Sequence, residues 1–233
     1  MTEYSEIICD YFMVQQDDVR LQDELEENPA KFFRKMALYM KNAIPLFNRP
    51  PDIRGWLKHT DADFDDYSVE TSGAFSDGDV IETGKTGYAL CSAGVLEEDD
   101  LGQLKYTPIE VEYDAETGDV TLLEVVGSGV EIQFDFYTDG YFEHDLTEEM
   151  KNILGMCVQY VWEKRFAGDF LYRTPKIRDK SFDTGNEANW TGKETERLRT
   201  VYGQLNSAMI AFEQALSANE TIPNAFRHRM PAT

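Results

Sequence analysis

The chain has 233 residues, of which 42% are hydrophobic and 12% aromatic, and this composition excludes a disordered chain because it suffices for a core. Its 44 acidic and 22 basic residues give a net charge of −22, which excludes a duplex-binding surface unless basic residues are segregated. No run approaches about 18 consecutive apolar residues, and the acidic start lacks the features of a signal peptide. We therefore expect a protein made in the cytoplasm, without a membrane span.

The negative charge is concentrated in the middle of the chain. Residues 61–150 contain 25 acidic residues but only Lys85 and Lys105 as basic ones, whereas residues 1–60 and 151–233 are close to neutral. Such a sharp change suggests a separate module with surroundings of its own. The plainer alternative is a solvated acidic surface that keeps the protein soluble.

Residues 3–44 have a helical pattern in two pieces. Asn28 followed by Pro29 predicts an N-cap with proline at the first helical position, so a new helix should begin here. This helix has a broad apolar face at helical spacing, formed by Phe32, Phe33, Met36, Leu38, Tyr39 and Met40. Its remaining surface is basic, with Lys31, Arg34, Lys35 and Lys41. Prolines between residues 45 and 51 end it and predict a stiff connector.

The middle of the chain changes to the two-residue period of β-strands. Short strands are predicted at Val80–Thr83 and Tyr88–Ser92, and residues 116–119 (ETGD) predict the turn of a hairpin. The clearest alternation sets Val130, Ile132, Phe134 and Phe136 against Glu131, Gln133 and Asp135. We therefore expect an antiparallel sheet with one packed face and one face covered by carboxylates.

A helical pattern returns after the strands. Asp145 with Glu148, or alternatively Thr147, predicts the cap of this helix. Cys157 lies on its apolar stripe, where we expect it to be a small buried hydrophobe.

A second, long helix is predicted to begin at Thr191, which with Glu194 matches a capping box. Its apolar stripe is predicted to consist of Leu198, Val201, Tyr202, Leu205, Met209, Phe212 and Leu216. A basic loop precedes it, with Arg173, Lys176, Arg178 and Lys180 as candidate contact residues. A proline-punctuated tail, Ile222–Thr233, follows it. We expect this tail to dock on a neighbouring subunit or a partner through Phe226, Arg227, His228 and Arg229, the alternative being a frayed terminus.

The expected fold is α+β. It consists of a helical bundle built from the N- and C-terminal helices, an acidic antiparallel β insertion and an extended C-terminal tail. The expected domains are residues 1–60 (N-terminal helices and proline-rich connector), 61–144 (the β insertion) and 145–233 (C-terminal helices and docking tail). The first and the last together should form one helical domain.

No motif in the chain supports enzymatic chemistry. Residues 84–86 (GKT) lack both the glycine spacing of a phosphate loop and a long helix after it. The three histidines and three cysteines are far apart, and none lies at the spacing of a metal site or of a nucleophile with its base. We therefore predict no catalytic residue and no cofactor.

The acidic run Asp61–Ser72 begins like a calcium-binding loop. Its sixth position is aspartate where the loop requires glycine, and its twelfth is serine where the loop requires glutamate. We therefore predict no metal site, with weak cation binding by the acidic cluster as the alternative.

Four stretches of the chain form two pairs. The first pair is NPAKFFRKM (28–36) and IPLFNRPP (44–51), and the second is FDFYTDGYF (134–142) and LTEEMKNIL (146–154). Together they resemble structural proteins of tailed bacteriophages, of the head–tail connector (adaptor or neck) type. The resemblance covers most of the chain and includes no catalytic signature.

The resemblance implies a non-enzymatic virion protein. Such a protein forms a homo-oligomeric ring, of twelve copies, that joins the portal protein to the tail or its stopper protein and lines the DNA channel. It also implies a C-terminal extension that docks on the portal, at the position of Ile222–Thr233. The expected location is the head–tail junction of the virion, and the host cytoplasm before assembly.

Electrostatics favours this interpretation, because an acidic wall lets a duplex slide whereas lysines would hold it. Two alternatives remain open. One is another virion part, a tail-completion or tail-terminator protein. The other is an acidic protein that mimics DNA or neutralises a basic toxin, as immunity-type inhibitors do.

Overall fold

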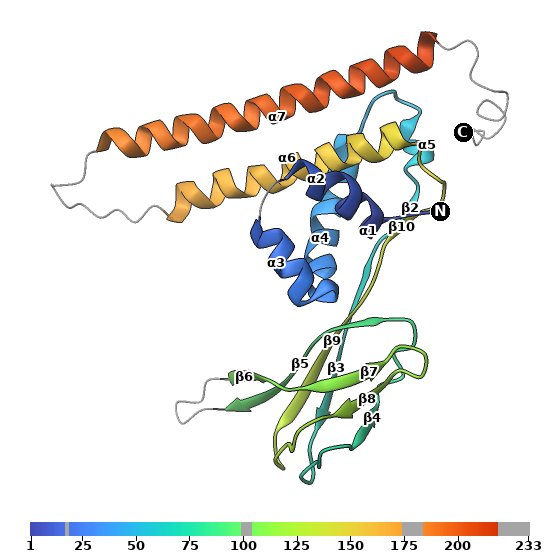
Figure 1. Ribbon diagram of the computed structural model, residues 1–233, viewed down its shortest axis with the longest axis vertical. Helices are drawn as coiled ribbons and strands as arrows, with labels where there is room; N and C mark the ends of the chain where they lie inside the picture. Colours follow the sequence, from blue (N-terminus) through green and yellow to red (C-terminus); the bar gives the residue numbers. More distant parts are fainter. Residues whose placement is uncertain (17–18, 99–103, 174–183, 219–233) are drawn as a thin grey trace. The chain divides into compact units, whose positions relative to one another are not determined.

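The structure is a computed structural model, and it describes residues 1–16, 19–98, 104–173 and 184–218. The chain divides into two compact units. Unit 1 contains Met1–Asp18, Met36–Thr60 and Tyr141–Thr233, and unit 2 contains Val19–Lys35 and Asp61–Gly140. Each unit is described by itself below (Figure 1).

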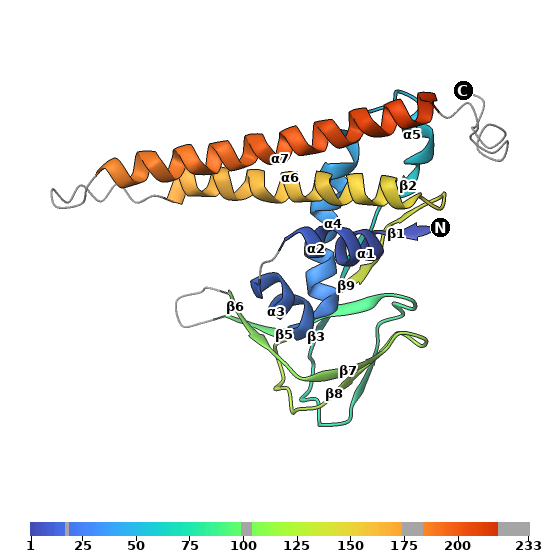
Figure 2. The same cartoon turned by 45° about the horizontal axis from the view of Figure 1, so that its top comes forward.

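Unit 1 is mainly helical. Its elements are β1 (Thr2–Glu3), α1 (Tyr4–Ile7), the π-helix η1 (Ile8–Phe12), α2 (Met13–Gln15), the second half of α4 (Pro29–Ala43), the 3-10 helix η2 (Ile44–Leu46), α5 (Ile53–Trp56), β2 (His59–Thr60), β10 (Tyr141–Phe142), α6 (Glu148–Arg173) and α7 (Thr184–Ala218). The helices α6 and α7 lie side by side (Figures 1 and 2). The three short strands form a small antiparallel sheet in the order β1-β10-β2.

The predicted apolar stripe of α7 packs inward at Val201, Leu205, Met209 and Phe212, all of which are buried. Tyr202, assigned to the same stripe, is instead 49% exposed. Cys157 of α6 is fully buried, as predicted.

The π-helix η1 crosses α6 at Gly155. A Cβ atom added to Gly155 would lie 2.7 Å from Tyr11 Cβ and 3.1 Å from the Tyr11 carbonyl carbon. Real Cβ atoms essentially never approach another atom as closely as 2.7 Å, so the crossing requires glycine at this position.

Unit 2 is a pair of antiparallel sheets with α3 (Val19–Glu27) and the first half of α4. The strands of the larger sheet, in the order β3-β9-β5-β6, are β3 (Asp63–Glu70), β9 (Glu131–Thr138), β5 (Ala89–Glu98) and β6 (Leu104–Pro108). Those of the smaller sheet, in the order β4-β8-β7, are β4 (Val80–Glu82), β8 (Asp119–Leu122) and β7 (Val111–Asp114).

The two sheets of unit 2 share one apolar core. The inward residues of β9, Ile132, Phe134 and Phe136, are completely buried, and so are Val120 and Leu122 of β8. This confirms the predicted alternation, because side chains on a strand point to opposite faces in turn. The predicted hairpin also forms, with β7 and β8 joined at a turn where Gly118 has a φ of +79°.

The prediction of one helical bundle carrying a single β insertion is wrong. Residues 19–35 belong to unit 2, not to a bundle of N- and C-terminal helices. The strands are distributed over three antiparallel sheets, one of which lies in unit 1. The helical period was correct, but it cannot reveal whether an apolar face packs on a helix or on a sheet. The predicted extended tail lies outside the described residues.

The start of α6 matches one of its two predicted caps, whereas the start of α7 does not match its predicted cap. The backbone N–H of Met150 donates to Thr147 Oγ1 over 3.4 Å, so the alternative cap is the one formed. The helix α7 begins at Thr184, seven residues before the predicted capping box at Thr191.

Among the described residues, no helix has both the length and the apolar character needed to cross a membrane.

Candidate functional site

The docking residues predicted from sequence lie mostly outside the described residues. This holds for Phe226, Arg227, His228 and Arg229 of the tail and for Lys176, Arg178 and Lys180 of the basic loop. Arg173 is the last residue of α6, and only its backbone is described. The described part of the chain presents other surfaces, formed by other residues.

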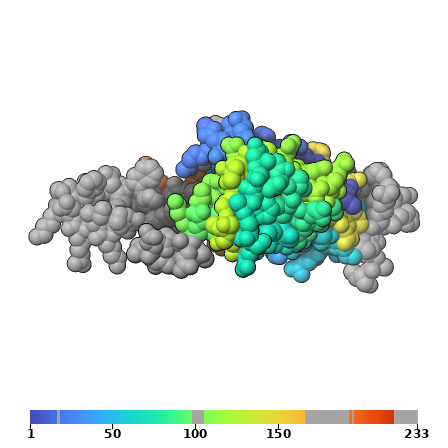
Figure 3. Space-filling view, turned by 90° about the horizontal axis from the view of Figure 1, so that it is seen from below, coloured from blue at the N-terminus to red at the C-terminus, as the bar shows by residue number. Residues whose placement is uncertain are grey.

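The outer face of the smaller sheet carries three carboxylates in register. Asp119 of β8 pairs with Glu82 of β4 on one side and with Asp114 of β7 on the other. Their neighbours Val120 and Ile81 point into the core, so these three carboxylates point outward. We call Glu82, Asp119 and Asp114 the acidic row. Segments 61–90 and 105–125, coloured teal and green, form one continuous surface in Figure 3.

The acidic row opposes the stability of its own sheet. Like charges directly opposite one another on neighbouring strands are destabilising. Within the part of the chain that the structure describes, none of the three carboxylates forms an ion pair. The expected face of carboxylates is therefore present on this sheet, and the folded state tolerates its electrostatic cost.

The outer face of the larger sheet differs from that of the smaller sheet, because α4 covers part of it. Arg34 of α4 reaches Asp66 of β3 through Nη2 and Asp135 of β9 through Nη1, each over 3.3 Å. Its guanidinium carbon also lies 5.7 Å from the centre of the Phe64 ring. Planar guanidinium groups are suited to such a combination of carboxylates and an aromatic face. Arg34 thus fastens α4 to two adjacent strands of unit 2.

Asn28 makes a second connection between α4 and the sheet. Its Oδ1 accepts the backbone N–H of Lys31 over 2.9 Å, which is the predicted N-cap. Its Nδ2 donates to the backbone oxygen of Cys91 in β5 over 2.8 Å. The Cys91 side chain is buried, and this burial raises the pKa of the thiol to about 11.

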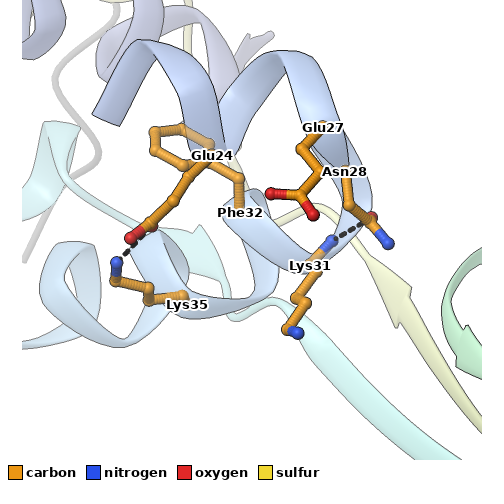
Figure 4. Close-up of a pocket in the computed structure, with 6 residues that line it drawn as sticks. All are labelled: Glu24, Glu27, Asn28, Lys31, Phe32 and Lys35. Atoms are coloured by element: carbon orange, nitrogen blue, oxygen red, sulfur yellow. Dashed lines mark hydrogen bonds and ion pairs between the residues drawn. The ribbon is translucent and has the colours of Figure 1, made fainter. Parts of the chain in front are cut away.

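A hollow of about 470 Å³ lies between α3 and the start of α4. Figure 4 shows its lining, with the Lys35 ammonium paired with the Glu24 carboxylate across it. Phe32 forms an apolar part of the lining, and Lys31 and Glu27 add charges of both signs. One ion pair therefore spans the hollow, and no side chain of its lining is set up for covalent chemistry.

A second, shallow hollow of about 400 Å³ lies where β5 and the segment leading into β7 meet. Leu90, Ile109, Val111 and Leu123 contribute its apolar lining, and Glu110 contributes a carboxylate. We call this feature the β5–β7 groove. It combines apolar side chains with an acidic one on the surface of unit 2.

Most of the acidic run Asp61–Ser72 lies in the strand β3 (Asp63–Glu70) and does not form a calcium loop. The ammonium of Lys85 bonds the Asp65 carboxylate, and this hydrogen bond lowers the pKa of Asp65 below its ordinary value. The Tyr88 hydroxyl donates to Asp63 over 2.7 Å. Lys85, from the segment compared above with a phosphate loop, is therefore engaged by a carboxylate.

The described residues contain no group of three or more histidine, cysteine or acidic side chains placed to hold a metal ion. Burial raises the pKa of the Cys157 thiol strongly, and that of Cys91 as stated above, so both are protonated at neutral pH. Neither thiol is in a state suited to nucleophilic chemistry.

The sequence alone did not reveal either Arg34 or the β5–β7 groove as features of interest. Arg34 was assigned to the basic remainder of a helix, and its carboxylate partners are 32 and 101 positions away along the chain. The groove is formed by segments whose proximity depends on the sheet order.

No model of a protein family matches this chain, and a search of curated proteins finds no match to it either.

Proposed function

We propose that this chain is a non-enzymatic virion structural protein of the head–tail connector type. In this role it forms an adaptor ring that joins the portal protein to the tail and lines the channel through which DNA passes. The proposal rests on the resemblance of residues 28–51 and 134–154 to such proteins. The alternative within the virion is a tail-completion or tail-terminator protein.

The observation that carries the proposal is the acidic row. A sheet with Glu82, Asp119 and Asp114 in register loses stability through repulsion, so solubility alone is a poor reason to place the three together. A wall that faces moving DNA benefits from this arrangement, because it offers the phosphates no cation and hence no release of counterions.

The distribution of charge supports a ring as well. Many copies of a chain with a net charge of −22 repel one another, so an assembly must bury apolar surface away from that charge. Residues 1–60 and 151–233, which are close to neutral, provide segments where copies can meet.

The experiment is mass photometry of the full chain, alone and mixed with the portal protein encoded in the same genome. We expect rings alone, or a monomer that assembles into a ring on the portal. Assembly on isolated tail tubes, but not on the portal, would support the tail-completion alternative. A monomer that ignores both and binds one basic protein in a salt-sensitive manner would overturn the proposal in favour of an acidic inhibitor.

A further inference from the structure

The β5–β7 groove is an apolar site on a strongly acidic unit. Its lining includes the apolar side chains of Leu90, Ile109, Val111 and Leu123, and Leu123 is 46% exposed. Large apolar side chains that gather at one exposed place mark interaction sites more often than isolated ones do. The groove volume of about 400 Å³ falls in the range that accommodates an anchoring side chain with its neighbours.

The rim of the groove is negatively charged. Glu110 lines it, and Glu124 Oε1 accepts the backbone N–H of Glu110 over 2.8 Å, which places a second carboxylate next to the backbone of Glu110. Both side chains are exposed. The fitting occupant therefore combines a large apolar group with nearby cations.

Addition of a strand to the neighbouring edge of β5 is obstructed. The strand β6 pairs with β5 only from Gly94 onward, which leaves the edge before it next to the groove. There the Cys91 carbonyl already accepts a bond from Asn28, the Ala93 carbonyl accepts one from Ile109 N–H, and the register of β5 shifts beside Cys91. An occupant must bind through its side chains and not through backbone pairing.

We propose that the occupant is the tail of a second copy of this chain, with Phe226 as the apolar anchor in the β5–β7 groove. Residues 227–229 are the only place in the sequence where three basic side chains are consecutive, and residues 222–233 contain no acidic one. Arg227 and Arg229 thus complement the carboxylates of Glu110 and Glu124.

The tail is long enough to extend well away from the end of α7. Residues 219–233 follow α7, and an extended chain of that length reaches about 50 Å. The inference rests on the proposed function in one respect, because a ring supplies the neighbouring copy at close range. It deepens that function by assigning the tail to a contact between subunits and not to the portal.

The test places a photo-reactive benzoylphenylalanine at position 226 of the full chain. Copies labelled with ¹⁴N and ¹⁵N are mixed and irradiated, and cross-linked peptides are identified by mass spectrometry. We expect position 226 to cross-link to residues 90–93, 109–111 or 123, in pairs that join one light and one heavy copy. Cross-links confined to a single copy, or to other parts of unit 1 or unit 2, would overturn the inference.

Substitutions in the groove provide the matched controls. Leu123→Asp should lower the yield of these cross-links about tenfold, because it adds a carboxylate to an apolar site beside Glu110. Val80→Asp alters a residue of β4 that is 54% exposed and does not line the groove, and it should leave the yield unchanged. Equal yields in the two variants would contradict docking in the groove. Thermal melts confirm that both variants are folded.

Exchange of charge gives an independent readout. Arg227→Glu with Arg229→Glu should reduce the cross-links, and Glu110→Lys added to this pair should restore part of the yield. Absence of any rescue would count against the electrostatic contact.

The same samples are examined by mass photometry with the portal protein. Rings on the portal without cross-links in the groove would overturn this inference while the proposed function stands. Cross-links between copies, in a protein that never assembles on a portal, would overturn the proposed function alone.

Discussion

The carboxylate of Glu163 in α6 is almost fully buried, with a side-chain exposure of 6%, while its partner Arg197 in α7 is 57% exposed. Arg197 Nη2 lies 2.5 Å from Glu163 Oε1. Gln16 Nε2 donates to the same oxygen over 2.9 Å. A buried carboxylate is costly without partners, so Arg197 and Gln16 together make its position in the α6–α7 pair tolerable.

Removal of the Arg197 side chain should therefore destabilise the fold more than its 57% exposure suggests. Arg197→Ala should lower the free energy of unfolding by about 1–3 kcal/mol, because it leaves a buried carboxylate with one neutral donor. Glu163→Gln should cost less, since it removes the buried charge. Arg199→Ala, at an exposed position of the same helix, serves as control and should change stability by less than about 0.5 kcal/mol. Urea unfolding followed by circular dichroism measures all three.

Two glycines in helices should respond to alanine with opposite signs. Gly155→Ala should destabilise unit 1 by about 1–3 kcal/mol, because its Cβ would lie 2.7 Å from Tyr11 Cβ. Gly203→Ala in α7 should stabilise by about 0.5–1 kcal/mol, because nothing lies within 4 Å of its Cβ and alanine favours the helix. Thermal melting of both variants measures the two effects. Unchanged or increased stability of Gly155→Ala would contradict the close crossing, and a loss of stability in Gly203→Ala would contradict the open surroundings of Gly203.

Arg34 should be difficult to replace. Arg34→Ala removes contacts with Asp66, Asp135 and Phe64, and should destabilise unit 2 by about 1–2 kcal/mol. Arg34→Lys should recover only part of this, because an ammonium cannot reproduce the planar fork. Hydrogen exchange of the amides in β3 and β9 measures the effect within unit 2. Lys31→Ala, exposed on the same helix, is the control and should leave the exchange unchanged.

The contact between Tyr11 and Glu148 should make stability depend on acid pH. The Tyr11 hydroxyl donates to the Glu148 carboxylate, and this bond, with one from Lys151, lowers the pKa of Glu148 below its ordinary value. A lowered carboxyl pKa contributes stability that is present above the unfolded value, near pH 4.3, and lost as pH falls through the folded value. Tyr11→Phe should shift the pKa of Glu148 upward.

Carboxyl titration by NMR measures that shift directly. The difference in stability between Tyr11→Phe and the natural chain should be largest near neutral pH and shrink in acid. An unchanged titration of Glu148 in the variant would show that the hydroxyl is not the cause.

Reversal of charge in the acidic row should create an affinity for DNA. The triple substitution Glu82→Lys, Asp114→Lys and Asp119→Lys places three cations in register on one face. We expect the natural chain not to bind a duplex. The variant should bind it, with log K falling against log salt by about 0.9 for each phosphate contacted. Fluorescence anisotropy at several salt concentrations provides the measurement.

A control variant with the same net charge distinguishes the effect of where the lysines lie from the effect of how much the net charge changes. Glu3, Asp10 and Asp52 are exposed and lie in unit 1, away from the row in the sequence. Their replacement by lysine should produce weaker binding and a smaller salt slope than the triple substitution in the row. Equal binding by the two variants would attribute the repulsion of DNA to net charge alone.

The parts of the fold that depend on neighbours in the sequence could be predicted. The alternation along β9, the turn at Gly118 and the cap at Asn28 are each determined within a few residues, and the structure contains all three. Thr191 marks where this fails, since a capping-box pattern also occurs inside a helix that has begun earlier.

The parts of the fold that depend on residues far away in the sequence could not be predicted. The apolar face of residues 29–43 indicates a helix, yet nothing in it reveals that the first half packs with the strands of unit 2. The partners of Arg34 and Lys85 are carboxylates among many similar ones, and only the sheet register selects Asp66, Asp135 and Asp65. The β5–β7 groove is lined by the part of β5 that β6 leaves unpaired, and this depends on the sheet register.

The buried cysteines give each unit a reporter of its own opening. Cys91 in unit 2 is 2% exposed and Cys157 in unit 1 is 0% exposed, and burial raises the pKa of both thiols. Because the thiolate is the reactive form, an alkylating reagent can modify either one only after its surroundings open. The rate of modification at each position then measures how often that unit opens, as amide exchange does for the backbone. One time course, read by peptide mass spectrometry, would establish whether the two units open together or one before the other.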